Sequence, residues 1–273
     1  MSYASVMVYV EADGTPEQRV RLAANLADKF NAMLIGLSAL AVPPPMVADG
    51  VVMDEPTDAD IELLRAKLAD KGEWFRGIVG TNRRRLEWRS ALDLPIETLP
   101  REARAADLVV IGRVQAPGGT YRALDPGAAI LKLGRPTLVV PEDMNLLRSE
   151  HVVIGWKDTR EARRAMRDAL PFLHQAERVT VVEACGPGKE KTALGRLDDV
   201  MRYLTRHRIK AGPKVMLEQR GSGAEQLIGI AREERADLLV TGAYGHSRLG
   251  EWVFGGMTRE LLATSPICCL MSH

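Results

Sequence analysis

The chain has 273 residues with 37 Lys and Arg against 36 Asp and Glu, so its formal net charge is +1. A charge this close to zero gives no electrostatic basis for binding nucleic acid or an anionic membrane surface. Apolar residues make up 46% and charged residues 27%, which excludes wholesale disorder. No apolar run approaches the roughly 20 residues of a membrane-spanning helix, and the N-terminus lacks the basic region of a secretory signal. Three cysteines make no disulfide framework, and we expect a cytoplasmic protein of two domains.

Short apolar runs alternate with helical patterns along the first half of the chain. The sequence predicts strands over 6–10, 33–40, 86–89, 108–112 and 137–140, and helices over 16–30 and 57–77. The second half repeats the alternation, with strands over 152–156, 179–184, 214–218, 238–242 and 267–271 and helices over 159–174, 194–207, 224–234 and 258–263. This alternation predicts an α/β fold of doubly wound parallel sheets with right-handed crossovers. Ligands of such sheets bind beyond the carboxyl ends of the strands.

The two halves are internal repeats. Residues 105–112 (AADLVVIG) align with 235–242 (RADLLVTG), and at the same offset of 130 residues 134–140 align with 264–270. Two registers that agree without a gap indicate a duplicated domain. We expect a first domain over 1–143 and a second over 149–273, joined within 141–150.

The loop after the strand at 238–242 carries a spaced set of glycines. Gly242 and Gly245 are followed by nine residues and then by Gly255-Gly256-Met257-Thr258 at the start of a predicted helix. Glycines let backbone N–H groups approach an anion, and the first N–H groups of a helix point outward. Two such turns could face one polyphosphate from two sides, or they could simply be tight turns.

Residues 242–258 resemble the Gly-2x-Gly-9x-Gly-(Ser/Thr) motif of the universal stress protein family, and the repeat extends the resemblance over both halves. The resemblance implies Rossmann-like domains with strand order 3-2-1-4-5, related by a pseudo-twofold axis through their last strands. It also implies ATP, with Mg²⁺ accompanying it, between the first strand of the second domain and the glycine motif. The halves would then form a pseudo-dimer within one chain, which leaves a homodimer open as well.

The sequence also departs from the family pattern. Gly256 stands where the motif has Ser or Thr, and Thr258 could supply the missing hydroxyl. After the first strand of the second half, Lys157 occupies the place of the family's adenosine-binding Asp, with Asp158 one residue on. His246 lies inside the loop and could donate to a phosphate. The candidate binding residues are therefore Trp156, Lys157, Asp158, Gly242, Gly245, His246, Gly255, Gly256, Met257 and Thr258.

The equivalent loop of the first half keeps Gly112 but has Asp125-Pro126 where Gly255-Gly256 would fall. Pro126 has no N–H to give a phosphate and Asp125 would repel one, so we expect no nucleotide in this half. A different ligand remains open, because Arg113 and Tyr121 lie in the loop and the insertion at 42–56 could cover it.

Three function classes follow from these observations. The first is a stress-response regulatory protein that binds an adenine nucleotide without committed catalysis and acts on unidentified protein partners. The second is a slow ATP hydrolase, and the third is an interaction protein that has lost its nucleotide. No catalytic triad, paired carboxylates or metal-ligand spacing can be assembled from the sequence, so no catalytic or metal-binding residue is expected.

Overall fold

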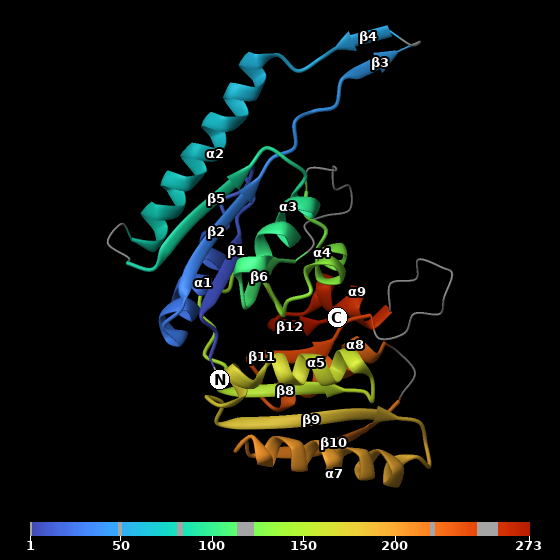
Figure 1. The fold of residues 1–273 in the computed structure, drawn as a ribbon. Coiled ribbons are helices and arrows are strands. Elements are labelled where there is room, and N and C mark those ends of the chain that lie inside the picture. The colour runs from blue at the N-terminus through green and yellow to red at the C-terminus, as the bar shows by residue number, and fades with distance from the viewer. Residues whose placement is uncertain (1, 49–50, 81–83, 114–122, 219–221, 245–255) are drawn as a thin grey trace.

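One mixed sheet of ten strands runs through the whole molecule in the computed structural model (Figure 1). The structure describes residues 2–48, 51–80, 84–113, 123–218, 222–244 and 256–273, and only the backbone of 46–48 and 51–54. Within these ranges, no helix combines the length and the apolar character that crossing a membrane requires.

Both halves alternate strands and helices as the sequence predicts. The first half contains β1 (Ser5–Tyr9), α1 (Glu17–Phe30), β2 (Met33–Ala39), β3 (Met46–Ala48), β4 (Val51–Asp54), α2 (Asp58–Val79), β5 (Leu86–Ala91), α3 (Pro95–Glu102), the short 3₁₀ helix η1 (Ala103–Ala105), β6 (Leu108–Gly112), α4 (Pro126–Leu133) and β7 (Thr137–Val140). The second half contains β8 (His151–Trp156), α5 (Arg160–Asp168), α6 (Leu170–Leu173), β9 (Arg178–Cys185), α7 (Glu190–Arg206), β10 (Ala211–Leu217), α8 (Gly223–Glu233), β11 (Leu238–Gly242), α9 (Gly256–Thr264) and β12 (Cys268–Ser272).

The strand order confirms the expected topology in each half. The sheet reads β10-β9-β8-β11-β12-β7-β6-β1-β2-β5, so each half has the order 3-2-1-4-5. Strands within a half pair in parallel, whereas β12 and β7 pair antiparallel and join the halves. The last strand of each half, which would otherwise be an exposed apolar edge, is therefore covered by its counterpart.

The register of the β7–β12 pair places a pseudo-twofold axis within the chain. Val139 pairs directly with Cys269, and these positions are equivalent in the repeat because 269 − 139 = 130. A residue that pairs with its own equivalent lies on the symmetry axis. The offset read from the sequence and the register of the sheet thus agree, and the predicted pseudo-dimer arrangement is confirmed.

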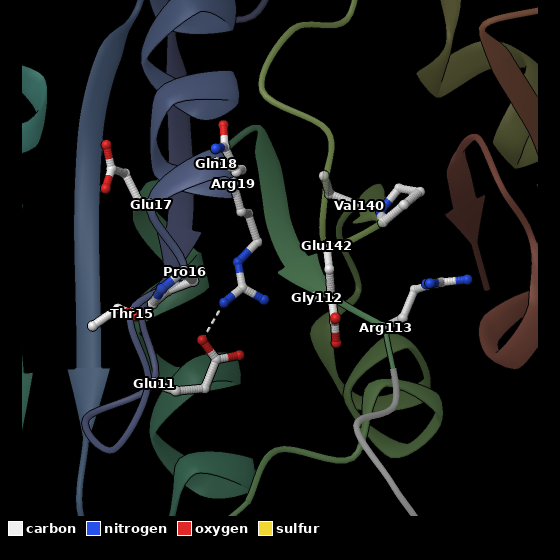
Figure 2. Close-up of a pocket in the computed structure, with 12 residues that line it drawn as sticks. Glu11, Thr15, Pro16, Glu17, Gln18, Arg19, Gly112, Arg113, Val140 and Glu142 are labelled. Atoms are coloured by element: carbon white, nitrogen blue, oxygen red, sulfur yellow. Dashed lines mark hydrogen bonds and ion pairs between the residues drawn. The ribbon is translucent and has the colours of Figure 1, made fainter.

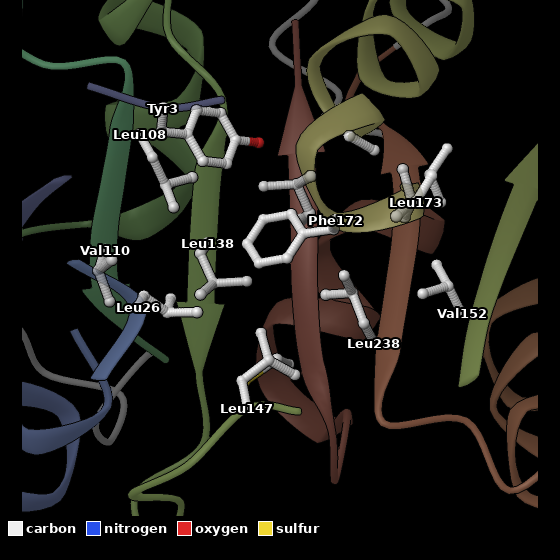
Figure 3. Close-up of a cluster of buried hydrophobic side chains, with 14 of the residues drawn as sticks. Tyr3, Leu26, Leu108, Val110, Leu138, Leu147, Val152, Phe172, Leu173 and Leu238 are labelled. Carbon is white, nitrogen blue, oxygen red and sulfur yellow. The ribbon is translucent and has the colours of Figure 1, made fainter. Parts of the chain in front are cut away.

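Two hydrophobic layers cover the sheet, one on each face. Helices α1, α2, α5, α6 and α7 pack on one face, and α3, α4, α8 and α9 pack on the other. On the first face the core continues across the junction of the halves (Figure 3). There the ring of Phe172 lies 5.6 Å from that of Tyr3 and 5.2 Å from that of Phe30, both edge-on. The halves share this core, because Tyr3 and Phe30 belong to the first and Phe172 to the second.

Three local features differ from the sequence expectations. The helix expected over 159–174 is divided into α5 and α6, because Pro171 has no N–H to continue the ladder of hydrogen bonds. Helices α3 and α4 were not predicted, since both begin at a proline and are only eight residues long. The insertion at 42–56 contains the β3–β4 hairpin, a separate two-stranded sheet that extends beyond the start of α2 (Figure 1). Tyr121 and most of the loop that this insertion could cover lie outside the described residues.

Candidate functional site

A cavity of about 460 Å³ lies at the carboxyl ends of the central strands of the second half. Its walls come from β8 and the loop after it, from β9, β10 and β11, and from the first turns of α8 and α9. The strand order reverses between β8 and β11, and crevices at such a point are the usual ligand sites of doubly wound sheets. The volume falls within the roughly 300–1,000 Å³ of small-molecule sites.

Gly242 forms one wall of this cavity and also packs the nearest helix. A Cβ at this position would lie 2.6 Å from the backbone nitrogen of Ala162 and 2.7 Å from the carbonyl carbon of Glu161. Both are backbone atoms in the first turn of α5, so they cannot move aside as a side chain would. The glycine is therefore required for α5 to sit directly on the end of β11, a packing role that the sequence motif did not indicate.

The start of α9 forms the opposite wall. An added Cβ at Gly256 would meet no atom of a described residue within 4 Å, so the described part of the cavity has room beside the first residue of the helix. Thr258 is buried, and its Oγ1 accepts a hydrogen bond of 3.3 Å from the N–H of Tyr244. That bond ties α9 to the loop after β11, and Met257 lines the same wall. Gly245, His246 and Gly255 lie outside the described residues.

Of the candidate residues at and after the end of β8, only some line the cavity. Lys157 lines it and is exposed, whereas Trp156 borders it while its side chain belongs to the core beneath α5 and α7. The indole Nε1 of Trp156 is buried with no hydrogen-bond partner among the described residues. Asp158 does not line the cavity, because it turns outward into an ion pair of 2.5 Å with Arg163.

The sequence motifs did not indicate the apolar residues that form the rest of the cavity wall. Val182 and Met216, from β9 and β10, and Leu227, from α8, line the cavity with apolar side chains, beside the polar Glu218 and Gln226. Such surfaces suit a flat ring, and their position at strand ends was the available signal. Among the described residues, no three His, Cys, Asp or Glu side chains are grouped to hold a metal ion.

Tyr244 connects this cavity to the first half of the chain. It lines the cavity, adopts a left-handed φ of 58°, and its ring lies 6.5 Å from that of His273. Its hydroxyl lies against α4, where a Cβ on Gly127 would collide with it. Burial and the nearby carboxylate of Asp125 raise the pKa of Tyr244 to about 12, so the phenol is neutral at physiological pH.

The corresponding segments of the first half are arranged differently. Gly112, the equivalent of Gly242, faces the guanidinium of Arg19 instead of a helix backbone. Asp125 is the N-cap of α4, and its carboxylate accepts a hydrogen bond of 2.6 Å from the N–H of Ala128, while Pro126 occupies the first turn. The Asp-Pro pair that replaces the glycines is thus a favourable helix start that uses one of the helix's own outward N–H groups.

Comparisons with known proteins agree with this architecture. Residues 149–273 match the model of the universal stress protein family. A universal stress protein from Archaeoglobus fulgidus has a similar structure, with a TM-score of 0.74 at 12% identity, over 97% of this chain and 95% of that one. A functionally unknown protein from Pseudomonas aeruginosa gives 0.59 at 13% identity, over 99% and 92%. These structures are similar in fold, and a search of curated proteins gave no match.

Proposed function

Because the second half of this chain, residues 149–273, belongs to the universal stress protein family, we propose that it binds one adenine nucleotide, ATP, in the cavity between β8 and β11. One observation carries the proposal. The cavity lies at the strand switch point and is bounded by Gly242 and Tyr244 on one side and by the first turn of α9 on the other. The protein would then be a nucleotide-responsive regulator of stress physiology that acts through protein partners.

The start of α9 would receive the phosphates. The first N–H groups of a helix lack partners and carry partial positive charge, which favours an anion there. Gly256 places no side chain between that backbone and the cavity. Lys157 adds a positive charge from the wall after β8, and the O–H of Thr258 can donate while its oxygen accepts from Tyr244. Mg²⁺ would arrive with the phosphates, whose oxygens it prefers.

The apolar walls from β9, β10 and α8 would hold the adenine ring. Met216 and Leu227 line that part of the cavity, and Gly155 keeps the end of β8 close to α8, since its Cβ would lie 2.8 Å from Leu227. In place of the Asp that nucleotide-binding relatives carry, Lys157 offers no carboxylate to the adenosine. We infer that recognition of the nucleoside rests on the shape of the cavity and on backbone groups.

The purified protein tests this proposal directly. Mass spectrometry of a denatured sample is expected to release ATP or ADP at no more than one molecule per chain. If no nucleotide is released and none binds on addition, the third class, an interaction protein without nucleotide, replaces the proposal. A turnover assay then separates regulation from slow hydrolysis: we expect bound ATP to stay intact over the time in which it exchanges, and steady release of phosphate would assign a hydrolase.

A further inference from the structure

A second cavity, of about 410 Å³, lies in the first half at a different place in the fold (Figure 2). It is formed by the loop after β1, the start of α1 and the carboxyl ends of β6 and β7. The candidate nucleotide cavity of the second half shares the equivalents of the loop after β1 and of Gly112, but it extends to β9, β10, α8 and α9. No described residue of their counterparts β2, β5, α3 and α4 lines the first-half cavity, which reaches the end of β7 instead. The two cavities therefore overlap only in part, and the different walls of this one call for a different ligand.

Arg19 is a buried cation in the wall of this cavity. The residue is 5% exposed, and its Nη2 pairs with the carboxylate of Glu11. Its Nε is buried with no hydrogen-bond partner within the described residues. Figure 2 shows the guanidinium pointing into the space between Glu11 and Glu142. Gly112 makes this position accessible, because any Cβ there would collide with Nη1. A buried guanidinium with unused donors is costly unless a further acceptor is supplied.

The start of α1 supplies an independent source of donors beside Arg19. Pro16 is the N-cap residue of this 14-residue helix and provides no side-chain hydrogen bond to its first turn. The equivalent helix of the second half, α5, is capped by the side chain of Thr159. The N–H of Glu17 donates to the carbonyl of Thr15 over 2.7 Å, and the following N–H groups of the first turn, with the positive end of the helix dipole, lie at the wall of the cavity.

The charges around the cavity select among anions. Glu11 pairs with Arg19, and Glu17 pairs with Arg21 through a contact of 2.7 Å. The other wall charges of the described residues are Glu142 and Arg113, and Arg113 donates to the carbonyl of Ser265 over 3.0 Å. The wall thus carries three carboxylates, those of Glu11, Glu17 and Glu142, so a phosphate dianion is repelled more strongly than a singly charged ligand that pairs with Arg19.

We propose that this first-half cavity binds a small organic carboxylate, held by the guanidinium of Arg19 and by the start of α1. The bound carboxylate would take the donors that Glu11 leaves unused. Glu11 then competes with the ligand for Arg19. Removing the charge of Glu11 should therefore strengthen ligand binding, which would not occur if Glu11 and Arg19 formed only a structural ion pair.

Acetate is the probe, and the side-chain Nε–H signal of Arg19 in the full-length protein is the readout, assigned by its loss in Arg19→Met. Addition of acetate is expected to move this signal in a saturable way, and inorganic phosphate at the same ionic strength is expected not to. Glu11→Gln keeps the shape of the side chain but removes its charge, so acetate should bind at least tenfold more tightly. Because Arg19→Met lacks this signal, binding to that variant is followed by the broadening of the acetate methyl resonance on addition of protein, which should no longer occur.

Thermal unfolding without acetate establishes whether each variant is folded. If Arg19→Met alone does not fold, the double variant Glu11→Gln/Arg19→Met replaces it, because it leaves no unpaired charge at position 11. Either folded Arg19→Met protein must fail to bind acetate. The proposal is overturned if acetate leaves the Arg19 signal unchanged in both the parent and Glu11→Gln. It is also overturned if phosphate saturates the site as well as acetate does, since the site would then select for charge and not for a carboxylate.

Discussion

Substituting Gly242 by Ala tests whether this glycine serves the fold or the ligand. The added Cβ would lie 2.6 Å from the backbone nitrogen of Ala162 and 2.9 Å from the Cβ of Glu161. Real Cβ atoms do not approach backbone so closely, so α5 must move away from β11. Overpacking of this kind costs about 1–3 kcal/mol, and we expect the free energy of unfolding in urea to fall by that amount.

Gly256→Ala is the matched control, because it introduces the same methyl group on the opposite wall of the same cavity, where no atom of a described residue lies within 4 Å. Alanine is also the better helix former, so its stability should equal or slightly exceed that of the parent. Both unfolding curves are measured without nucleotide, so that ligand binding does not enter the comparison. If Gly242→Ala is as stable as Gly256→Ala, the close approach of α5 to β11 is wrong and Gly242 is not a packing residue.

Three further predictions concern the junction, the first-half helix start and the linking tyrosine. Phe172→Ala should lower the free energy of unfolding by about 3–5 kcal/mol. Because Phe172 packs on Tyr3 and Phe30 across the junction, near-ultraviolet and far-ultraviolet circular dichroism should still report one unfolding transition. Separate transitions would mean that the halves do not share a core. Asp125→Ala should cost about 0.5–2 kcal/mol in urea unfolding and Asp125→Gly only a few tenths, and equal losses would refute the N-cap role. Burial raises the pKa of Tyr244 from 10 to about 12, so between these pH values the folded state holds a proton that the unfolded state has lost. The free energy of unfolding should therefore decline as pH rises through this interval. Tyr244→Phe should show a shallower decline, and a pH profile identical to that of the parent would contradict the raised pKa.

The framework of the fold follows directly from the sequence. The strands over 108–112 and 137–140 appear at the predicted residues, because buried parallel strands are continuous apolar runs bounded by turn residues. The repeat offset also predicts which residues lie on the pseudo-twofold axis, because equivalent residues of the last strands pair there, as Val139 and Cys269 do.

The features that the sequence could not provide depend on contacts between distant segments. Gly242 and Gly112 are equivalent in the repeat, yet one meets a helix backbone and the other a guanidinium. Nothing near Arg19 in sequence indicates that it is buried beside Gly112. The apolar walls at Val182 and Met216 likewise form only when β9 pairs with β8 and β10 pairs with β9. Motifs located the region of the candidate site, and the packing of the strands determines its shape.

We propose that the second half alone binds ATP, against the start of α9. Calorimetric titration of the parent, Gly256→Val and Gly229→Val with ATP distinguishes this arrangement from the alternatives. Within the part of the chain that the structure describes, an added Cβ at either glycine meets no atom within 4 Å, but of the two only Gly256 lines the cavity, whereas Gly229 lies further along α8. We expect one site per chain, with an affinity for ATP that is weakened at least tenfold (about 1.4 kcal/mol) by Gly256→Val and unaffected by Gly229→Val. Two equivalent sites, or equal affinity in Gly256→Val and the parent, would contradict it.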